Sequence, residues 1–87
     1  MKNNDTAFLF PCSYPLKVMG LNSQAFTEAV QAVLRNHLPE GGQSWSSRLS
    51  SGDKYLSITV TFFAESKDQV DAIYRDLNSL EQVLMTL

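Results

Sequence analysis

Hydrophobic and polar residues alternate most regularly in the segment 54–64. One phase of the alternation carries large apolar side chains, and the other carries short hydroxyl side chains. The two sets are Leu56, Ile58, Val60 and Phe62 on the first phase and Ser57, Thr59 and Thr61 on the second. A period of two residues is typical of a strand that buries one face. The segment therefore predicts a central strand whose other face is open and lined by hydroxyl groups.

The segment 14–21 shows the same alternation less strongly. Leu16 and Val18 predict a buried phase. The residues between and after them, Lys17 and Met19, then belong to the opposite face. The segment predicts the first strand of the chain.

Two prolines, Pro11 and Pro15, stand at the start of this region. Each lacks an amide donor, and proline is therefore confined to sheet edges and strand starts. Residues 10–15 are accordingly predicted to approach the sheet along its margin, outside the central ladder.

Two more strands are predicted at 45–50 and 83–87. The first of them is joined to the segment 54–64 by the short turn 51–53, which predicts an antiparallel hairpin. In the last strand, Leu84 and Thr86 are assigned to the open face of the sheet, on the phase opposite to Val83 and Met85.

Two segments instead follow the helical period of three to four residues. The first apolar stripe follows a capping residue, Asn22 or Ser23, and comprises Phe26, Ala29, Val30, Val33, Leu34 and His37. The second follows Ser66 and comprises Val70, Ile73, Tyr74 and Leu77. Serine or asparagine before such a stripe accepts a hydrogen bond from a first-turn amide, and Ser66 with Gln69 has the spacing of a capping box.

The predicted order is strand, helix, strand, strand, helix, strand. Right-handed crossovers then give an α+β, ferredoxin-like two-layer sandwich of βαββαβ topology. Its antiparallel sheet has the order 4-1-3-2, with both helices on one face. We expect residues 1–9 to form a flexible lead-in and residues 10–87 to form a single domain.

Composition excludes several functional classes. The chain has 87 residues and a net charge of −2, with 7 basic and 9 acidic residues, so a nucleic-acid partner is not expected. A single cysteine, Cys12, allows neither an internal disulfide nor a multi-cysteine metal site. No cofactor or metal is predicted.

The polar N-terminus and the lack of an apolar run near 20 residues predict a cytoplasmic protein with no membrane partner.

No residue pattern predicts catalysis. Cys12 and His37 invite a nucleophile and base reading, but a strand and a helix separate them and no charge favours a thiolate. We interpret Cys12 as structural and His37 as a partner of the helix-terminal carbonyls. The chain is therefore predicted not to be an enzyme.

Three known uses of this architecture also lack their residues here. An acyl-phosphate hydrolase needs an arginine beside the loop 20–22, and a metal carrier needs two cysteines. An RNA-recognition sheet stacks bases on central aromatic residues. The corresponding central positions here are hydroxyl residues, with Tyr55 and Phe63 only at the strand ends.

The open sheet face is the remaining candidate. Its predicted interaction residues combine two cations, short hydroxyl side chains and an apolar centre, and they are Lys17, Met19, Arg48, Ser57, Thr59, Thr61 and Leu84. The face is either a solvated surface or a docking face in which the cations meet an anionic group.

Four segments, 10–12, 15–20, 55–60 and 83–87, resemble the YbeD-like family of small bacterial proteins of unknown function. The most specific parts are Lys-Val-Met-Gly at 17–20 and Tyr-x-Ser-hydrophobic-Thr at 55–59. The resemblance covers residues 10–87 and implies an ACT-like sandwich, a shape that binds amino acids or other small effectors and often pairs side by side. It implies no catalytic residues.

ACT-like effector sites lie near the loop between the first strand and the first helix, often with a glycine. Gly20, Leu21 and Asn22 occupy that place and form the candidate effector loop. We therefore predict a non-enzymatic regulatory or protein-interaction domain with an unknown protein partner. The alternative is an ACT-like sensor of a small effector such as an amino acid or carboxylate, and a homodimer is a further option.

Overall fold

The computed structural model describes residues 9–39 and 41–87. Nearly all of the predicted lead-in therefore lies outside the described residues. The elements of the described chain are β1 (Cys12–Leu21), α1 (Gln24–His37), β2 (Ser44–Leu49), a short 3-10 turn (Ser51–Asp53), β3 (Tyr55–Ala64), α2 (Lys67–Asn78) and β4 (Val83–Thr86).

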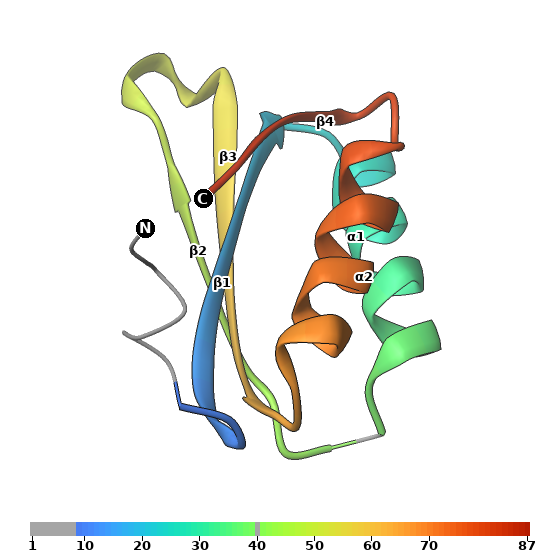
Figure 1. Ribbon diagram of the computed structural model, residues 1–87. Coiled ribbons are helices and arrows are strands. Elements are labelled where there is room, and N and C mark those ends of the chain that lie inside the picture. Colours follow the sequence, from blue (N-terminus) through green and yellow to red (C-terminus); the bar gives the residue numbers. More distant parts are fainter. Residues whose placement is uncertain (1–8, 40) are drawn as a thin grey trace, which may run out of the picture.

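The four strands form one antiparallel sheet in the order β2-β3-β1-β4. Both helices lie against the same face of this sheet, and β4 returns across the end of β1 (Figure 1). The predicted ferredoxin-like βαββαβ sandwich with sheet order 4-1-3-2 is thus confirmed. The face opposite the helices, called the open face below, carries neither helix.

α1 is capped by Ser23, one of the two predicted candidates, and α2 is capped by the predicted Ser66. The hydroxyl of Ser23 accepts from the amide of Phe26, and that of Ser66 accepts from the amide of Gln69, each at 3.1 Å. The side-chain carbonyl of Gln69 accepts from the amide of Glu65 at 2.7 Å, one residue before the capping-box position. These bonds satisfy amides that have no partner within the helix.

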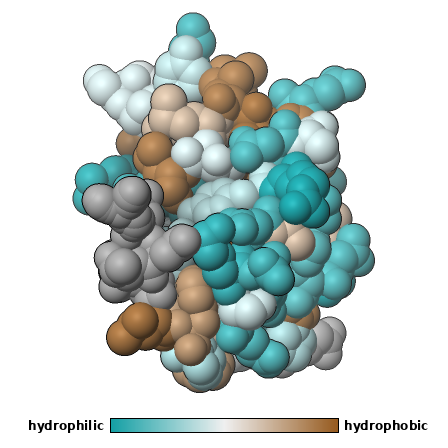
Figure 2. Space-filling view, in the orientation of Figure 1, coloured by the Kyte–Doolittle hydropathy of each residue, from teal (hydrophilic) through white to brown (hydrophobic). Residues whose placement is uncertain are grey.

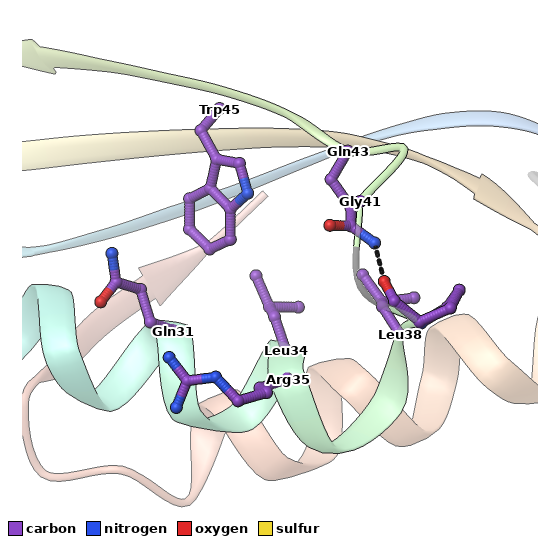
Figure 3. A pocket seen from close by; sticks show the side chains of 8 residues that line it. Gln31, Leu34, Arg35, Leu38, Gly41, Gln43 and Trp45 are labelled. Atoms are coloured by element: carbon purple, nitrogen blue, oxygen red, sulfur yellow. Dashed lines mark hydrogen bonds between the residues drawn. The ribbon is translucent and has the colours of Figure 1, made fainter.

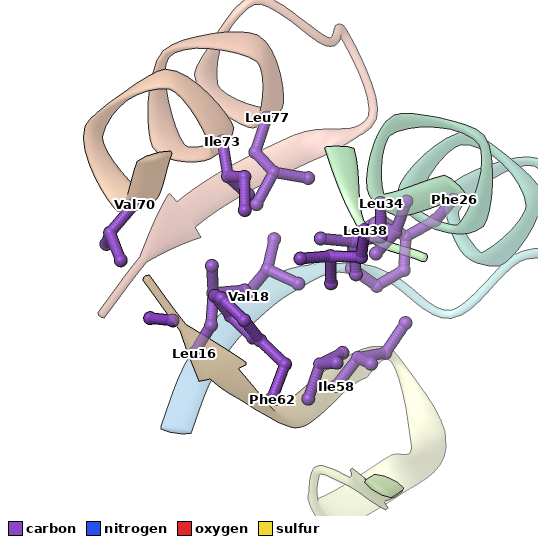
Figure 4. Close-up of a cluster of buried hydrophobic side chains, with 13 residues drawn as sticks. Leu16, Val18, Phe26, Leu34, Leu38, Ile58, Phe62, Val70, Ile73 and Leu77 are labelled. Carbon is purple, nitrogen blue, oxygen red and sulfur yellow. The ribbon is translucent and has the colours of Figure 1, made fainter. Parts of the chain in front are cut away.

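The core lies between the sheet and the two helical stripes (Figure 4). It contains the apolar phases of β1 and β3 and one stripe from each helix: Leu16, Val18, Ile58, Val60, Phe62 and Ala64 from the sheet, and Phe26, Val30, Leu34, Leu38, Val70, Ile73 and Leu77 from the helical layer. Of the four β3 residues that the alternation predicts to be buried, Ile58, Val60 and Phe62 are buried and Leu56 is partly buried against the core, and Ala64 extends the same phase. Burial of these side chains is the main force that holds the two layers together.

Gly20 allows α1 and β4 to approach β1 closely. A Cβ atom at this position would lie 2.5 Å from Cδ1 of the Phe26 ring and would also collide with the main-chain oxygen of Gln82. Phe26 is fully buried at the start of α1. The glycine is therefore required by packing, because any larger residue would separate these elements.

β1 begins at Cys12, earlier than predicted, and it includes Pro15, which pairs with Thr61 of β3. The prediction that residues 10–15 approach along the sheet margin is thus wrong for 12–15, which pair with β3, whereas residues 10 and 11 precede the strand. β4 pairs with β1 only in its second half, from Val18 to Gly20. The first half of β1 therefore has a strand on one side only, where a missing amide donor is tolerated.

β4 contains a register shift that no local pattern indicates. Val83 pairs with Gly20 and Met85 pairs with Met19, which leaves Leu84 as the extra residue of a bulge. Thr86 pairs with the buried Val18 and therefore faces the helices, where its hydroxyl lies 3.3 Å from the Asn78 side-chain oxygen. The assignment of Thr86 to the open face is wrong, and Met85 takes that place.

Tyr74 of α2 holds the end of the chain against the fold. Its hydroxyl donates to the main-chain oxygen of Leu87 at 2.7 Å and lies 3.3 Å from the Tyr14 hydroxyl. Burial and these tyrosine contacts raise the pKa of Tyr74 well above the ordinary value of 10.0.

Candidate interaction face

The strand register brings the candidate residues of three strands together on the open face. Lys17 of β1 pairs with Thr59 of β3, and Arg48 of β2 pairs with Ser57 of the same strand. Together with Ser46 and Ser47 of β2, these four side chains line a hollow of about 370 Å³. We call it the basic hollow.

Two exposed cations dominate the electrostatics of the basic hollow. Within residues 9–39 and 41–87, neither Lys17 nor Arg48 has an ion pair. The open-face phases of β1, β2 and β3 also contain no aspartate or glutamate. The field of both cations is therefore directed into solvent, and the hydroxyl groups around them can donate or accept hydrogen bonds.

A smaller apolar hollow adjoins the basic one. It has a volume of about 130 Å³, shares Arg48 and Ser57 with its neighbour, and is otherwise lined by Met19, Leu49, Ser50 and Tyr55. Met85 of β4 pairs with Met19 and extends the apolar area. Hydrophobic residues gather where β4 crosses the upper end of the sheet (Figure 2). A site suited to an anion and an apolar site are thus side by side.

Five of the seven predicted face residues line one of these two hollows, and Thr61 and Leu84 line neither. Thr61 lies farther along β3, beside Pro15 and Ser44. Leu84 lies at the β4 bulge and is 56% exposed. Sequence reasoning missed Ser46 and Tyr55, although each shares the alternation phase of a predicted neighbour and could have been found by that rule.

The candidate effector loop is tied to the turn between β2 and β3. The amide of Asn22 donates to the Lys54 carbonyl at 2.9 Å, and its side-chain amide donates to the Asp53 carbonyl at 3.1 Å. Leu21 is exposed, whereas Gly20 is buried beneath Phe26. The effector role of this loop stays a prediction, and the packing around Gly20 supplies a structural reason for the glycine.

His37 and Cys12 have separate surroundings. His37 ends α1, and its Nε2 atom lies 2.6 Å from the Asp76 carboxylate of α2, so it joins the two helices. Cys12 is partly buried at the start of β1, where it pairs with Ala64.

A groove separates α1 from β2 on the helix side of the sheet. Trp45 projects from β2 towards Gln31 and Leu34 of α1 (Figure 3). On one side of its ring lies a hollow of about 260 Å³ against α1, and on the other lies one of about 160 Å³ beside Ser47 and Leu56. Trp45 is 43% exposed. α1 therefore leaves the outer strand of the sheet incompletely covered.

A family model described as "Protein of unknown function (DUF493)" matches residues 5–87. The chain belongs to the DUF493 family. The resemblance to the YbeD-like proteins of unknown function is thereby confirmed. A UPF0250 protein of Shewanella woodyi is 41% identical over 83 residues, covering 95% of this chain and 93% of the relative. A UPF0250 protein of Paraburkholderia phytofirmans is 39% identical, covering 97% and 96%.

Solved structures show the same architecture. The solution structure of protein HP0495 from H. pylori has a TM-score of 0.75 and 17% identity, covering 92% of this chain and 85% of that one. A second solution structure of HP0495 has a TM-score of 0.61. At 16–17% identity, the structural likeness to HP0495 shows only that this DUF493 chain has the same fold.

The described residues contain neither a cluster of metal ligands nor a helix that could span a membrane. In residues 9–39 and 41–87, no three His, Cys, Asp or Glu side chains gather as metal ligands. In the same part of the chain, neither helix has the length and hydrophobicity needed to cross a membrane.

Proposed function

We propose that this chain is a non-enzymatic interaction domain that binds an acidic segment of a partner protein on its open sheet face. The observation that carries the proposal is the basic hollow, which Lys17 and Arg48 both line and where neither has an ion pair within residues 9–39 and 41–87. The adjoining apolar hollow adds a site for an aliphatic or aromatic side chain. The expected ligand is thus a carboxylate next to an apolar group.

The chemistry of the lining residues suits recognition. The planar guanidinium of Arg48 can bind a carboxylate through two hydrogen bonds, while the ammonium of Lys17 acts as a point charge. The surrounding side chains are neutral hydroxyl groups that permit close approach. Exposed ion pairs contribute about 0.2–1 kcal/mol each, so we expect weak, reversible binding that salt reduces.

Affinity capture with matched variants tests this proposal. The variant Lys17→Glu with Arg48→Glu reverses both charges at exposed positions, so its circular dichroism spectrum and melting temperature should remain close to the parent values. Partners that bind the open face should be lost by this variant. They should be retained by Arg75→Glu, a charge reversal on α2. Equal recovery by the parent and the double variant would remove the open face as the binding site.

A second candidate is a sensor of a small carboxylate or amino acid, in line with the ACT-like shape that the family resemblance implies. The basic hollow favours it because about 370 Å³ is enough for a small organic acid. A thermal-shift screen with amino acids and carboxylic acids distinguishes the two sources of carboxylate. A ligand that binds the native state must raise the melting temperature, and Arg48→Glu should abolish that rise. Capture of a partner without any such shift favours the protein segment.

A further inference from the structure

The two edges of the sheet differ in how well they are protected. β4 has four residues and a bulge at Leu84, features that discourage the pairing of another strand. β2 has six residues, pairs with β3 without a register shift, and contains no proline. Among the described elements, β3 is its only strand partner. The outer main-chain groups of β2 are therefore available to an added strand.

The helix side of β2 presents apolar surface next to this edge. All six β2 residues are exposed. Trp45 and Leu49 pair with Val60 and Leu56 on the helix-side phase of β3 and are 43% and 45% exposed, and Leu49, at the end of β2, also borders the apolar hollow. The two hollows of about 260 and 160 Å³ that flank Trp45 open on the same side. An added strand would direct every second side chain towards this surface. Apolar side chains at those positions would cover Trp45 and Leu49.

The open side of β2 presents positive charge along the same edge. Ser46 and Arg48 point to this side, and Lys17 lies on it two strands away, across from Thr59. The intervening side chains of an added strand would reach the margin of the basic hollow. Carboxylates at these positions would face Arg48, which has no acidic partner among the described residues.

We infer that β2 is a strand-addition site for an extended segment of another protein in which apolar and acidic residues alternate. The inference rests on the proposed function and specifies how its partner binds. The apolar residues of that segment lie along Trp45 and Leu49, and its acidic residues lie on the side of Arg48. Main-chain hydrogen bonds to β2 join the segment to the sheet.

Charge selects such a partner over a second copy of this chain. Two copies paired through β2 would place two sets of open-face cations on one continuous surface. β2 itself carries no carboxylate to neutralise them. An acidic strand supplies the opposite charge at the same positions.

Trp45 provides a direct assay because it is the only tryptophan of the chain. The probe is a synthetic, end-capped ten-residue peptide of alternating valine and aspartate. Titration of the full chain should shift the Trp45 emission to shorter wavelength, because the added strand excludes water from the indole. Arg48→Glu should weaken binding about tenfold, since it replaces attraction by repulsion at an exposed position. Arg75→Glu should leave it unchanged.

Three control peptides isolate the features of the inference. A peptide with N-methylated amides removes the main-chain donors and should not bind. A peptide of the same composition with all valines before all aspartates breaks the alternation and should bind at least tenfold more weakly. A valine and lysine peptide reverses the charge and should not bind.

Each contrary outcome has a distinct meaning. Absence of an emission shift with the alternating peptide at 1 mM would overturn strand addition. Equal binding of the N-methylated peptide would also overturn it, but sensitivity to Arg48→Glu would then leave the proposed function standing. Binding that is unaffected by Arg48→Glu would count against both. A Trp45 shift on raising the concentration of the chain alone, with dimers in sedimentation, would assign the edge to a second copy.

Discussion

Replacement of Gly20 by alanine tests whether this glycine serves packing. The added methyl group would lie 2.5 Å from the Phe26 ring and would also meet the Gln82 carbonyl. Phe26 has no free space because it is fully buried, and the carbonyl belongs to the main chain before β4. One contact must therefore move a core side chain, and the other must move a segment of backbone.

The magnitude follows from two opposing effects. Overpacking of a filled core typically destabilises by about 1–3 kcal/mol. Alanine also lowers the conformational entropy of the unfolded chain. This effect stabilises the folded state by about 0.4–1 kcal/mol and offsets part of the loss. The net loss is then about 1–2 kcal/mol. For a domain of this size, each kcal/mol lowers the melting temperature by about 4–8 °C.

Urea unfolding followed by circular dichroism measures the loss. With a slope of about 1 kcal/mol per M, the midpoint of Gly20→Ala should fall by about 1–2 M. The same substitution in a Phe26→Leu background should be less destabilising, because the smaller side chain relieves one of the two contacts. A variant as stable as the parent would refute the packing argument and return Gly20 to the effector loop as its explanation.

Other substitutions probe the core, the caps and the end of the chain. Ile73→Ala removes a fully buried side chain and should destabilise by about 2–5 kcal/mol in urea unfolding, whereas Leu84→Ala at the exposed bulge should change stability by less than about 0.5 kcal/mol. Ser66→Ala removes the α2 cap and should lower stability by about 1 kcal/mol. Tyr74→Phe removes the hydrogen bond to Leu87 and should lower stability by about 1 kcal/mol at neutral pH.

The raised pKa of Tyr74 also predicts a dependence on pH. The folded chain holds this phenolic proton more tightly than the unfolded chain, whose pKa is near 10.0. The contribution of the protonated Tyr74 side chain to the free energy of unfolding is therefore complete below pH 10. It decreases as the pH rises above 10. Ultraviolet titration at 295 nm should show one tyrosine that ionises late, and Tyr74→Phe should lack it. A normal titration of all three tyrosines would contradict this reading.

Sequence patterns correctly predicted the features that are set by residues close together in the sequence. The alternation in 54–64 indicated which β3 side chains are buried, because strand geometry sends successive side chains to opposite faces. The pair Asn22 and Ser23 indicated the start of α1 to within one residue, and Ser66 indicated the start of α2, because a cap needs only the amides of the next turn. Lys17 and Arg48 were assigned to one face by the same rule.

Other features depend on segments that are distant in sequence. The bulge at Leu84 arises from how β4 meets β1, and it moves Met85 to the open face and Thr86 to the helix side. His37 finds Asp76 only when α1 and α2 pack together. Neither the bulge nor the contact between His37 and Asp76 can be recognised from the hydrophobic periodicity of its own segment.

The candidate site, too, was determined partly by the sequence and partly by the tertiary structure. The sequence by itself determined the two-layer fold and a face of cations and hydroxyl groups, because hydrophobic periodicity decides which side of each element is buried. Only the tertiary structure placed Lys17 and Arg48 around one hollow, since their distance depends on the register of β1 and β2 against β3. It also showed that Trp45 is 43% exposed on β2, which has a strand on one side only among the described elements, because the buried core lies over β1 and β3 and includes no β2 residue.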